Sequence, residues 1–177
     1  MTGGRVIRFI ALSFIVLFFV IAVAVRTLHF RIISSDSACA VGLYRETPLT
    51  LRRGTLVDAC LPLETARFAL ERGYLHSGDC TNGAEPIAKI IGALPGDMID
   101  IEPGWIAVNG IRLARSATVD RDTAGRPLAH VPWGGRRVPA AELWLFGFND
   151  RRSWDGRYFG AVSTATLRSN LEGIATW

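Results

Sequence analysis

An uncharged apolar segment near the N-terminus limits most strongly what this chain can fold into. Residues 9–25 contain no charged residue, and basic residues stand on both sides, with Arg8 before the segment and Arg26 after it. A helix of roughly 17 to 25 apolar residues is long enough to cross the hydrocarbon layer of a bilayer. We therefore expect residues 1–31 to form one membrane anchor for a separate domain, residues 32–177.

The sequence leaves two other interpretations of this segment open, a buried core helix and a cleaved signal peptide. A signal peptide has a shorter apolar region and a small-x-small cleavage site, of which Ala22-Val23-Ala24 is a weak version. The length of the apolar run favours an uncleaved signal anchor. Basic residues flank both ends, so the positive-inside rule decides little about orientation. The short basic N-terminus favours a cytoplasmic N-terminus and an external domain.

Residues 32–177 have the pattern of an all-β domain with one helix. Short runs of β-branched and aromatic residues alternate with Gly, Pro, Asn and Asp, which is typical of strands joined by turns. The runs are 55–57, 87–91, 98–101, 105–108 and 142–148. Asn109-Gly110 supplies the positive φ angles of a tight hairpin turn. A helix is expected at 63–72, with Gly73 as its C-terminal cap.

Composition argues against nucleic acid and metal ions as partners. The net charge is +4, but the arginines occur singly or in pairs and form no long basic run. The three cysteines and three histidines show no CxxC or HExxH spacing. We therefore expect neither a nucleic-acid interface nor a metal centre.

Lys89 is the single lysine among 20 lysine and arginine residues. Arginine keeps its proton near neutral pH, whereas a buried lysine can lose it. On a strand, Ile87, Lys89 and Ile91 point to one face, and an inward face would lower the lysine pKa by desolvation. A neutral lysine amine can take the proton of a serine hydroxyl. The alternative is a strand lysine whose amine reaches solvent.

Four segments, in order, resemble the TraF-type conjugative transfer peptidases, a branch of the type I signal peptidase family. They are Ser35-Asp36-Ser37 followed by Gly42-Leu43-Tyr44; Arg53-Gly54-Thr55-Leu56-Val57; Lys89 to Leu94-Pro95-Gly96-Asp97; and Gly147-Phe148-Asn149 followed by Ser153-Trp154-Asp155-Gly156-Arg157-Tyr158-Phe159-Gly160. Residues 72–75 and 78–80 are similar to the TraF branch in particular. The resemblance covers about residues 30 to 165.

The resemblance implies a mainly β, signal-peptidase-like coiled β-sheet domain on one N-terminal transmembrane helix. It also implies a short helical insertion at about residues 61–80. Cys60 and Cys80 flank this insertion, and in an oxidising compartment we expect them to form a disulfide rather than remain two separate thiols.

The chemistry implied by the resemblance is acyl transfer by a Ser-Lys dyad that needs no cofactor. Ser37 corresponds to the nucleophile and Lys89 to its general base. The Ser37 N–H and the Ser35 side chain correspond to the two donors of the oxyanion hole. Asp155 and Arg157 are expected to form a structural ion pair beside the site.

The sequence departs from the family pattern at three places. The proline expected shortly after the nucleophile is absent and the segment is one residue longer, which leaves Ser35 as an alternative to Ser37. Gly156 stands where a serine is usual, which predicts the loss of a hydroxyl that could orient Lys89. Thr55 replaces a common aspartate, which we interpret as structural. Cys39 is not expected to act as the nucleophile, because a thiol protease needs a histidine base.

These features together predict a serine endopeptidase of the bacterial inner membrane with its catalytic domain in the periplasm. The expected substrate is a conjugative pilin precursor or another polypeptide that emerges from the membrane, with pilin cyclisation as a further step. The lipid bilayer and a conjugative secretion apparatus are the other expected partners. The alternatives are a general signal peptidase and a catalytically silent envelope assembly protein.

Overall fold

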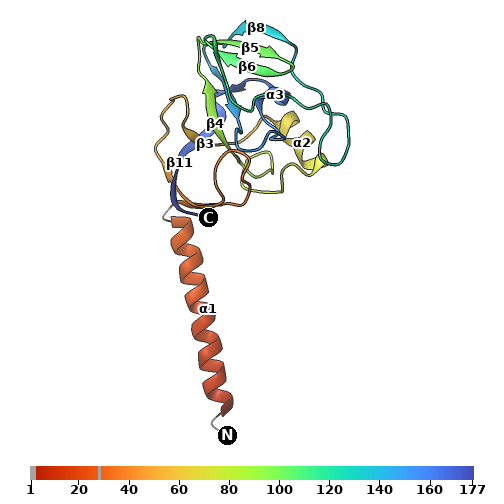
Figure 1. Cartoon of the computed structure of the whole chain (residues 1–177). Coiled ribbons are helices and arrows are strands. Elements are labelled where there is room, and N and C mark those ends of the chain that lie inside the picture. Colours follow the sequence, from red (N-terminus) through yellow and green to blue (C-terminus); the bar gives the residue numbers. More distant parts are fainter. Residues whose placement is uncertain (1–2, 28) are drawn as a thin grey trace.

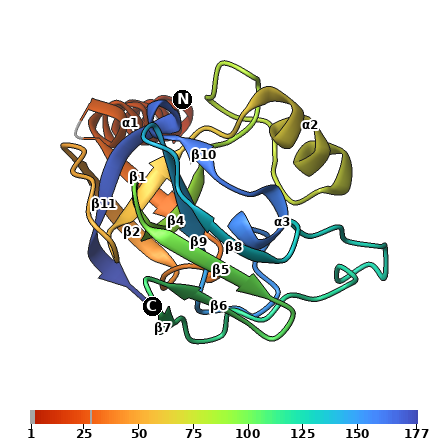
Figure 2. The same cartoon turned by 90° about the horizontal axis from the view of Figure 1, so that it is seen from above.

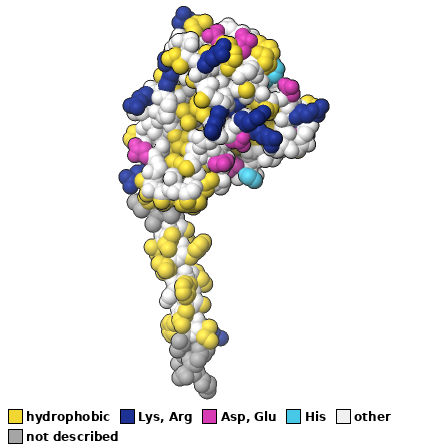
Figure 3. Space-filling view, in the orientation of Figure 1, with side chains coloured by type: hydrophobic (Ala, Val, Ile, Leu, Met, Phe, Trp, Pro, Cys, Tyr) yellow, Lys and Arg dark blue, Asp and Glu magenta, His cyan; other side chains and the backbone are white. Residues whose placement is uncertain are grey.

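The computed structural model describes residues 3–27 and 29–177, which form one long helix followed by a mainly β domain (Figure 1). The long helix, α1 (Gly3–Thr27), extends away from the domain as a single rod. Its described side chains are exposed, and Figure 3 shows that most of them are hydrophobic. Residues 1–2 and 28 of the expected anchor lie outside the described residues.

The expected membrane crossing by residues 1–31 is not supported. Among the residues that the structure describes, no helix combines the length and the apolarity needed to cross a membrane.

Two antiparallel sheets form the domain, and the larger one is curled (Figure 2). The larger sheet has the strand order β1-β2-β11-β3-β4-β9-β10. Its strands are β1 (Phe30–Ile33), β2 (Gly42–Thr47), β3 (Leu56–Ala59), β4 (Ile87–Ala93), β9 (Glu142–Phe146), β10 (Val162–Ser163) and β11 (Leu167–Thr176). The predicted mainly β class is confirmed.

The smaller sheet has the order β7-β6-β5-β8 and lies at the end of the domain farthest from α1 (Figure 1). Its strands are β5 (Met98–Glu102), β6 (Trp105–Val108), β7 (Ile111–Arg112) and β8 (Gly134–Arg137). Asn109 and Gly110 have φ angles of 50° and 79°, so the predicted hairpin between β6 and β7 is confirmed.

The helices of the domain are short. The predicted helix is present as α2 (Leu63–Arg72), and Gly73 closes it in the left-handed conformation at φ 69°. A one-turn helix, α3 (Gly156–Phe159), and a 3-10 turn (Thr164–Thr166) lie near the C-terminus.

Strand β9 joins the two hydrophobic cores of the domain. Leu143 and Leu145 point into a core with β3, β4 and α2, whereas Trp144 and Phe146 point into the core of the smaller sheet. Alternate residues of a strand point to opposite faces, so one strand can serve both cores. Burial of each such side chain stabilises the fold by about 1.5–3 kcal/mol. This packing fixes β9 and β4 side by side, and the candidate site lies next to them.

Candidate active site

Lys89, on an inner strand of the curled sheet, meets Ser37, which follows the end strand β1. Lys89 lies in the middle of β4, and Ser37 lies in the turn that follows β1. The Lys89 Nζ donates a hydrogen bond of 2.8 Å to the Ser37 Oγ and another of 2.7 Å to the Ser153 Oγ. A serine hydroxyl within hydrogen-bond reach of a base is the geometry that nucleophilic catalysis needs.

The environment of Lys89 favours its neutral form. The residue is only 6% exposed, on the strand face that also carries buried Ile87 and Ile91. Burial, with a smaller contribution from the charge of Arg157, lowers its pKa to about 8 against the opposing charge of Asp155. A lysine with this pKa has a substantial neutral fraction near physiological pH, so it can accept a proton.

The backbone after β9 holds Ser37 in place. The Ser37 carbonyl accepts hydrogen bonds from the N–H groups of Asn149 at 3.2 Å and Asp150 at 3.4 Å. Gly147 lies so close that a Cβ there would come within 2.6 Å of the Ser37 carbonyl oxygen and 2.2 Å of the Ser153 Oγ. Glycine at this position therefore allows the two chain segments to approach.

Ser153 supplies a hydroxyl that binds the Lys89 amine, a contact that we expected to be lost because Gly156 replaces a serine. We expected Gly156 to remove a group that orients Lys89, but the orienting hydroxyl belongs to Ser153, which is buried. Position 156 has a different constraint, because a Cβ there would lie 2.8 Å from the Leu145 carbonyl oxygen. The sequence contains the signal for Ser153, since it opens the Ser-x-Asp part of the fourth resembling segment, but we had given it no role.

Asp155 and Arg157 form a buried, two-pronged ion pair next to the dyad. The Arg157 Nε and NH2 donate to the two Asp155 carboxylate oxygens at 2.9 and 2.8 Å. Arg157 also donates to the carbonyl of Ser153 at 2.9 Å and that of Ala117 at 2.8 Å, while Asp155 accepts the Gly147 N–H at 2.8 Å. The pair thus ties together the backbone that carries Ser153 and Gly147.

Ser35 lies beside Ser37, and among the described residues the hydrogen bonds of the Lys89 amine go to Ser37 and Ser153 rather than to Ser35. The Ser35 Oγ accepts a 3.4 Å hydrogen bond from the Ser37 N–H, so this hydroxyl and this N–H are neighbours. Both are donors that a substrate carbonyl oxygen could reach. Of the two candidate nucleophiles, Ser37 is the one whose hydroxyl meets the lysine.

The cysteines fall into two groups. A disulfide joins Cys60 and Cys80 and closes the insertion that contains α2. Cys39 is free and half-buried, and burial raises the pKa of its thiol. A raised pKa disfavours the thiolate, which is the nucleophilic form. In the described part of the chain, no group of three His, Cys, Asp or Glu side chains could hold a metal ion.

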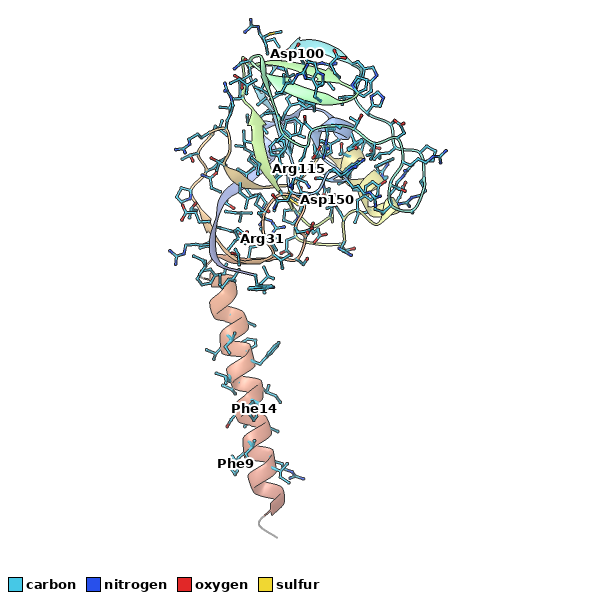
Figure 4. All side chains as sticks on the ribbon, viewed as in Figure 1. Phe9, Phe14, Arg31, Asp100, Arg115 and Asp150 are labelled. Atoms are coloured by element: carbon cyan, nitrogen blue, oxygen red, sulfur yellow. A yellow bond between two sulfur atoms is a disulfide. The ribbon has the colours of Figure 1, made fainter. Side chains whose placement is uncertain are left out.

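A cleft of about 290 Å³ opens over the dyad. One wall consists of residues 31–35 and Ser37, and the facing wall consists of residues 85–89. Residues 121–123 and 152–154, together with Val119 and Asp150, line its other sides. Figure 4 labels Arg31 and Asp150, which come from separate walls, and Figure 3 shows basic and acidic side chains close together on the domain surface.

The fold and this site define a class of protein. The family model described as signal peptidase, peptidase S26 matches residues 4–176, and the chain belongs to this family of serine peptidases.

Among curated proteins, the chain is similar to two TraF proteins. It is 30% identical to a plasmid transfer protein TraF of Escherichia coli over 146 residues, which cover 82% of each chain. It is 34% identical to the conjugal transfer protein TraF of Agrobacterium tumefaciens strain 15955 over 143 residues, 77% of each chain. Among solved structures, a signal peptidase I of Enterococcus faecalis V583 matches with a TM-score of 0.42 at 19% identity, covering 71% of this chain and 100% of that chain.

Proposed function

We propose that this protein is a serine endopeptidase in which Ser37 attacks the substrate and Lys89 is the general base. The observation that carries the proposal is the 2.8 Å contact between the Lys89 Nζ and the Ser37 Oγ, made by a buried lysine whose pKa is lowered to about 8. Membership of the signal peptidase S26 family supports it.

The proposed reaction has two steps. Neutral Lys89 takes the Ser37 hydroxyl proton as the Oγ attacks the scissile carbonyl carbon. The Ser37 N–H and the Ser35 hydroxyl donate to the resulting oxyanion, after which the C–N bond breaks and the amine leaves with the proton from Lys89. In the second step, water attacks the Ser37 ester and Lys89 again takes and returns a proton. A substrate amine in place of water would join the substrate's ends.

An extended peptide fits the cleft as an added strand. Strand β1 is the end strand of its sheet, and the pairing of β4 with β9 starts only at Ile90. Ile91 turns its N–H and C=O toward residues 54–55, beside β3. Backbone groups alternate in direction along a strand, so those of Ala88, like those of Ile90, point away from β3 and into the cleft. A substrate strand between β1 and β4 would therefore find main-chain partners beside the nucleophile.

We further propose that the substrate is a conjugative pilin precursor. The relatives named as plasmid or conjugal transfer proteins support a role in conjugation. Cyclisation of the processed pilin and contact with the conjugative apparatus belong to the same proposal.

The proposed location is the periplasmic face of the bacterial inner membrane. The Cys60–Cys80 disulfide supports an oxidising compartment. The exposed apolar side chains of α1 support attachment to lipid.

The test is processing of the cognate pilin precursor in cells, read by intact mass at matched protein levels. Ser37→Ala and Lys89→Arg should each abolish processing, because arginine keeps the charge but cannot act as a neutral base. Ser35→Ala should slow it by on the order of a hundredfold, as for loss of one oxyanion donor. Processing that survives Lys89→Arg would contradict the proposed mechanism. Equal processing of ordinary secretory precursors would contradict the proposed substrate.

A further inference from the structure

A buried ion pair crosses the end of the cleft opposite the dyad. The guanidinium of Arg31, on β1, donates to the carboxylate of Asp58, on β3, and at 2.5 Å to the carbonyl of Pro86 just before β4. The Asp58 side chain is fully buried, whereas 18% of the Arg31 side chain is exposed and lines the cleft. The chemistry of Ser37 and Lys89 does not use this pair.

The pair lies on the same face as the side chains nearest the nucleophile. Arg31 and Ile33 are two residues apart on β1 and therefore point to one face, and Asp58 is the cross-strand partner of Ala88. Ile33 and Ala88 pack in one cluster. Ile33 and Ala88 thus line one position of the cleft and Arg31 lines the next, while the buried Asp58 holds Arg31 without lining the cleft itself.

A substrate strand would place particular residues at these two positions. The half of the substrate that precedes the cut bond must stay bound, because it remains attached to Ser37 while the amine leaves. In an extended strand, alternate side chains share a face and are about 6.6 Å apart, the same spacing as residues 33 and 31. The first residue before the cut would then face Ile33 and Ala88, and the third would face Arg31.

Arg31 also ends the ladder of main-chain hydrogen bonds. Proline has no N–H, and the Pro86 carbonyl already accepts from Arg31. A substrate strand that pairs with Ala88 would therefore find no N–H donor at residue 86 and a carbonyl that it has to share with Arg31.

The end of the cleft is polar and carries charges of both signs, since Glu85 also lines the cleft beside Pro86. Arg168 lies 3.6 Å from the second Asp58 oxygen, so two guanidinium groups surround one carboxylate. A guanidinium has five N–H donors, and the hydrogen bonds of Arg31 to described residues go to two acceptors. Donors thus remain for a group that enters the cleft.

We propose that Arg31, held by Asp58, is a specificity-determining residue that selects an oxygen acceptor side chain at the third substrate position before the cut. The favoured class comprises Glu, Gln, Asp and Asn, and the disfavoured residues are Leu, Val, Lys and Arg. This inference rests on the proposed peptidase function. A hydrogen bond to a charged donor supports a preference on the order of tenfold.

The experiment is cleavage-site profiling with the full-length protein on a diverse peptide library, because the method needs no known substrate. Cut sites are identified by mass spectrometry, and residue frequencies are compared at each position before the cut. The wild type should enrich acceptor side chains over leucine about tenfold at the third position.

The informative variant replaces both members of the pair, Arg31→Met with Asp58→Leu, since removing Arg31 alone would leave the buried Asp58 carboxylate with only the more distant Arg168 as a partner. It should lose the acceptor preference at the third position and accept leucine there, while its preference at the first position stays unchanged. Arg45→Met, on the neighbouring strand and outside the cleft lining, is the matched control and should keep the wild-type profile.

Two outcomes would overturn the inference alone: a wild-type profile without the acceptor preference, or a paired variant with the wild-type profile. A wild-type protein that cuts no peptide while Ser37→Ala still supports pilin processing would instead contradict the proposed function, and with it the inference.

Discussion

At the scale of single residues, the important feature of the site is that the Lys89 amine has hydroxyl partners and no ion-pair partner among the described residues. The Nζ has two hydroxyl partners, Ser37 and Ser153, and no carboxylate forms an ion pair with it among the described residues. Asp155, the carboxylate whose charge acts most on Lys89, is already bound by Arg157. Burial without an ion-pair partner favours the neutral amine, which is the form that a general base needs.

Replacement of Ser153 tests whether this hydroxyl positions the base. Ser153→Ala should lower kcat on the order of tenfold or more with little change in KM, because Lys89 loses the bond that fixes its amine. The ammonium form also loses an acceptor, so the pKa of Lys89 should fall and the pH–rate inflection should move to lower pH. Steady-state kinetics across pH measure both. An unchanged inflection with unchanged kcat would contradict the positioning role.

The sequence singled out Ser37 and Lys89, which the structure places in contact, but not the residues that support them. Lys89 stood out because it is the single lysine, and Ser37 followed from the resembling segment. Ser37 and Ser153 are 116 positions apart in the sequence, and only the fold brings both hydroxyls to the Lys89 amine. No local sequence pattern indicates such a contact.

 The ion pair of Arg31 and Asp58 was missed for the same reason, since its members lie on different strands.

At the scale of secondary-structure elements, the segment that follows β9 organises the site. Within a few residues it supplies Gly147 at the close approach, the N–H groups that hold the Ser37 carbonyl, and Ser153. The buried pair of Asp155 and Arg157 fixes the segment by its hydrogen bonds to the Gly147 N–H and the Ser153 carbonyl. Breaking such a pair by removing one partner typically costs about 3–5 kcal/mol, so the segment is rigid only while both are present.

Gly147 should be intolerant of even one methyl group. In Gly147→Ala, the new Cβ would press on the Ser37 carbonyl and the Ser153 hydroxyl, so the nucleophile should move and kcat/KM should fall by on the order of a hundredfold. The matched control is Gly104→Ala, where a Cβ meets nothing within 4 Å. Kinetics and thermal unfolding of both variants check this. Equal activity of the two variants would contradict the close approach.

The disulfide should stabilise the helical insertion. Replacing both Cys60 and Cys80 by serine should lower the free energy of unfolding by about 3 kcal/mol, because the unfolded chain gains freedom in a loop of 20 residues. Urea unfolding measures the loss. A reducing agent should destabilise the wild type by a similar amount and leave the double variant unchanged. A wild type indifferent to reduction would contradict the prediction.

Local elements were predictable because their signals are local. Gly73 marks the end of α2, and Asn109-Gly110 marks the hairpin, so both were placed correctly from sequence. Strands β2 and β11 were not singled out, because they carry polar and charged residues on their open face and lack a continuous apolar run. The two strands pair with each other although they lie near opposite ends of the chain, and such a pairing leaves no local sequence pattern.

At the scale of the whole molecule, the curled sheet explains why Ser37 and Lys89 can meet. Strand β1 and strand β4 are separated by three strands in the sheet order, yet Arg31 reaches the Pro86 carbonyl. The curl leaves the cleft between the two strands, and the ion pair of Arg31 and Asp58 lies at one end of it. The resemblance of four segments predicted this architecture in outline, whereas the expected transmembrane helix is not supported.

The central claim is that neutral Lys89 activates Ser37, and the pH dependence of kcat/KM on a purified precursor tests it most directly. The folded-state pKa of Lys89 is lowered to about 8, and only the deprotonated amine accepts the Ser37 proton. The rate should therefore be low at about pH 6, rise through an inflection near pH 8 and level off above it, and Lys89→Arg should be inactive throughout. A rate that is flat across this range, or an active Lys89→Arg enzyme, would contradict the account.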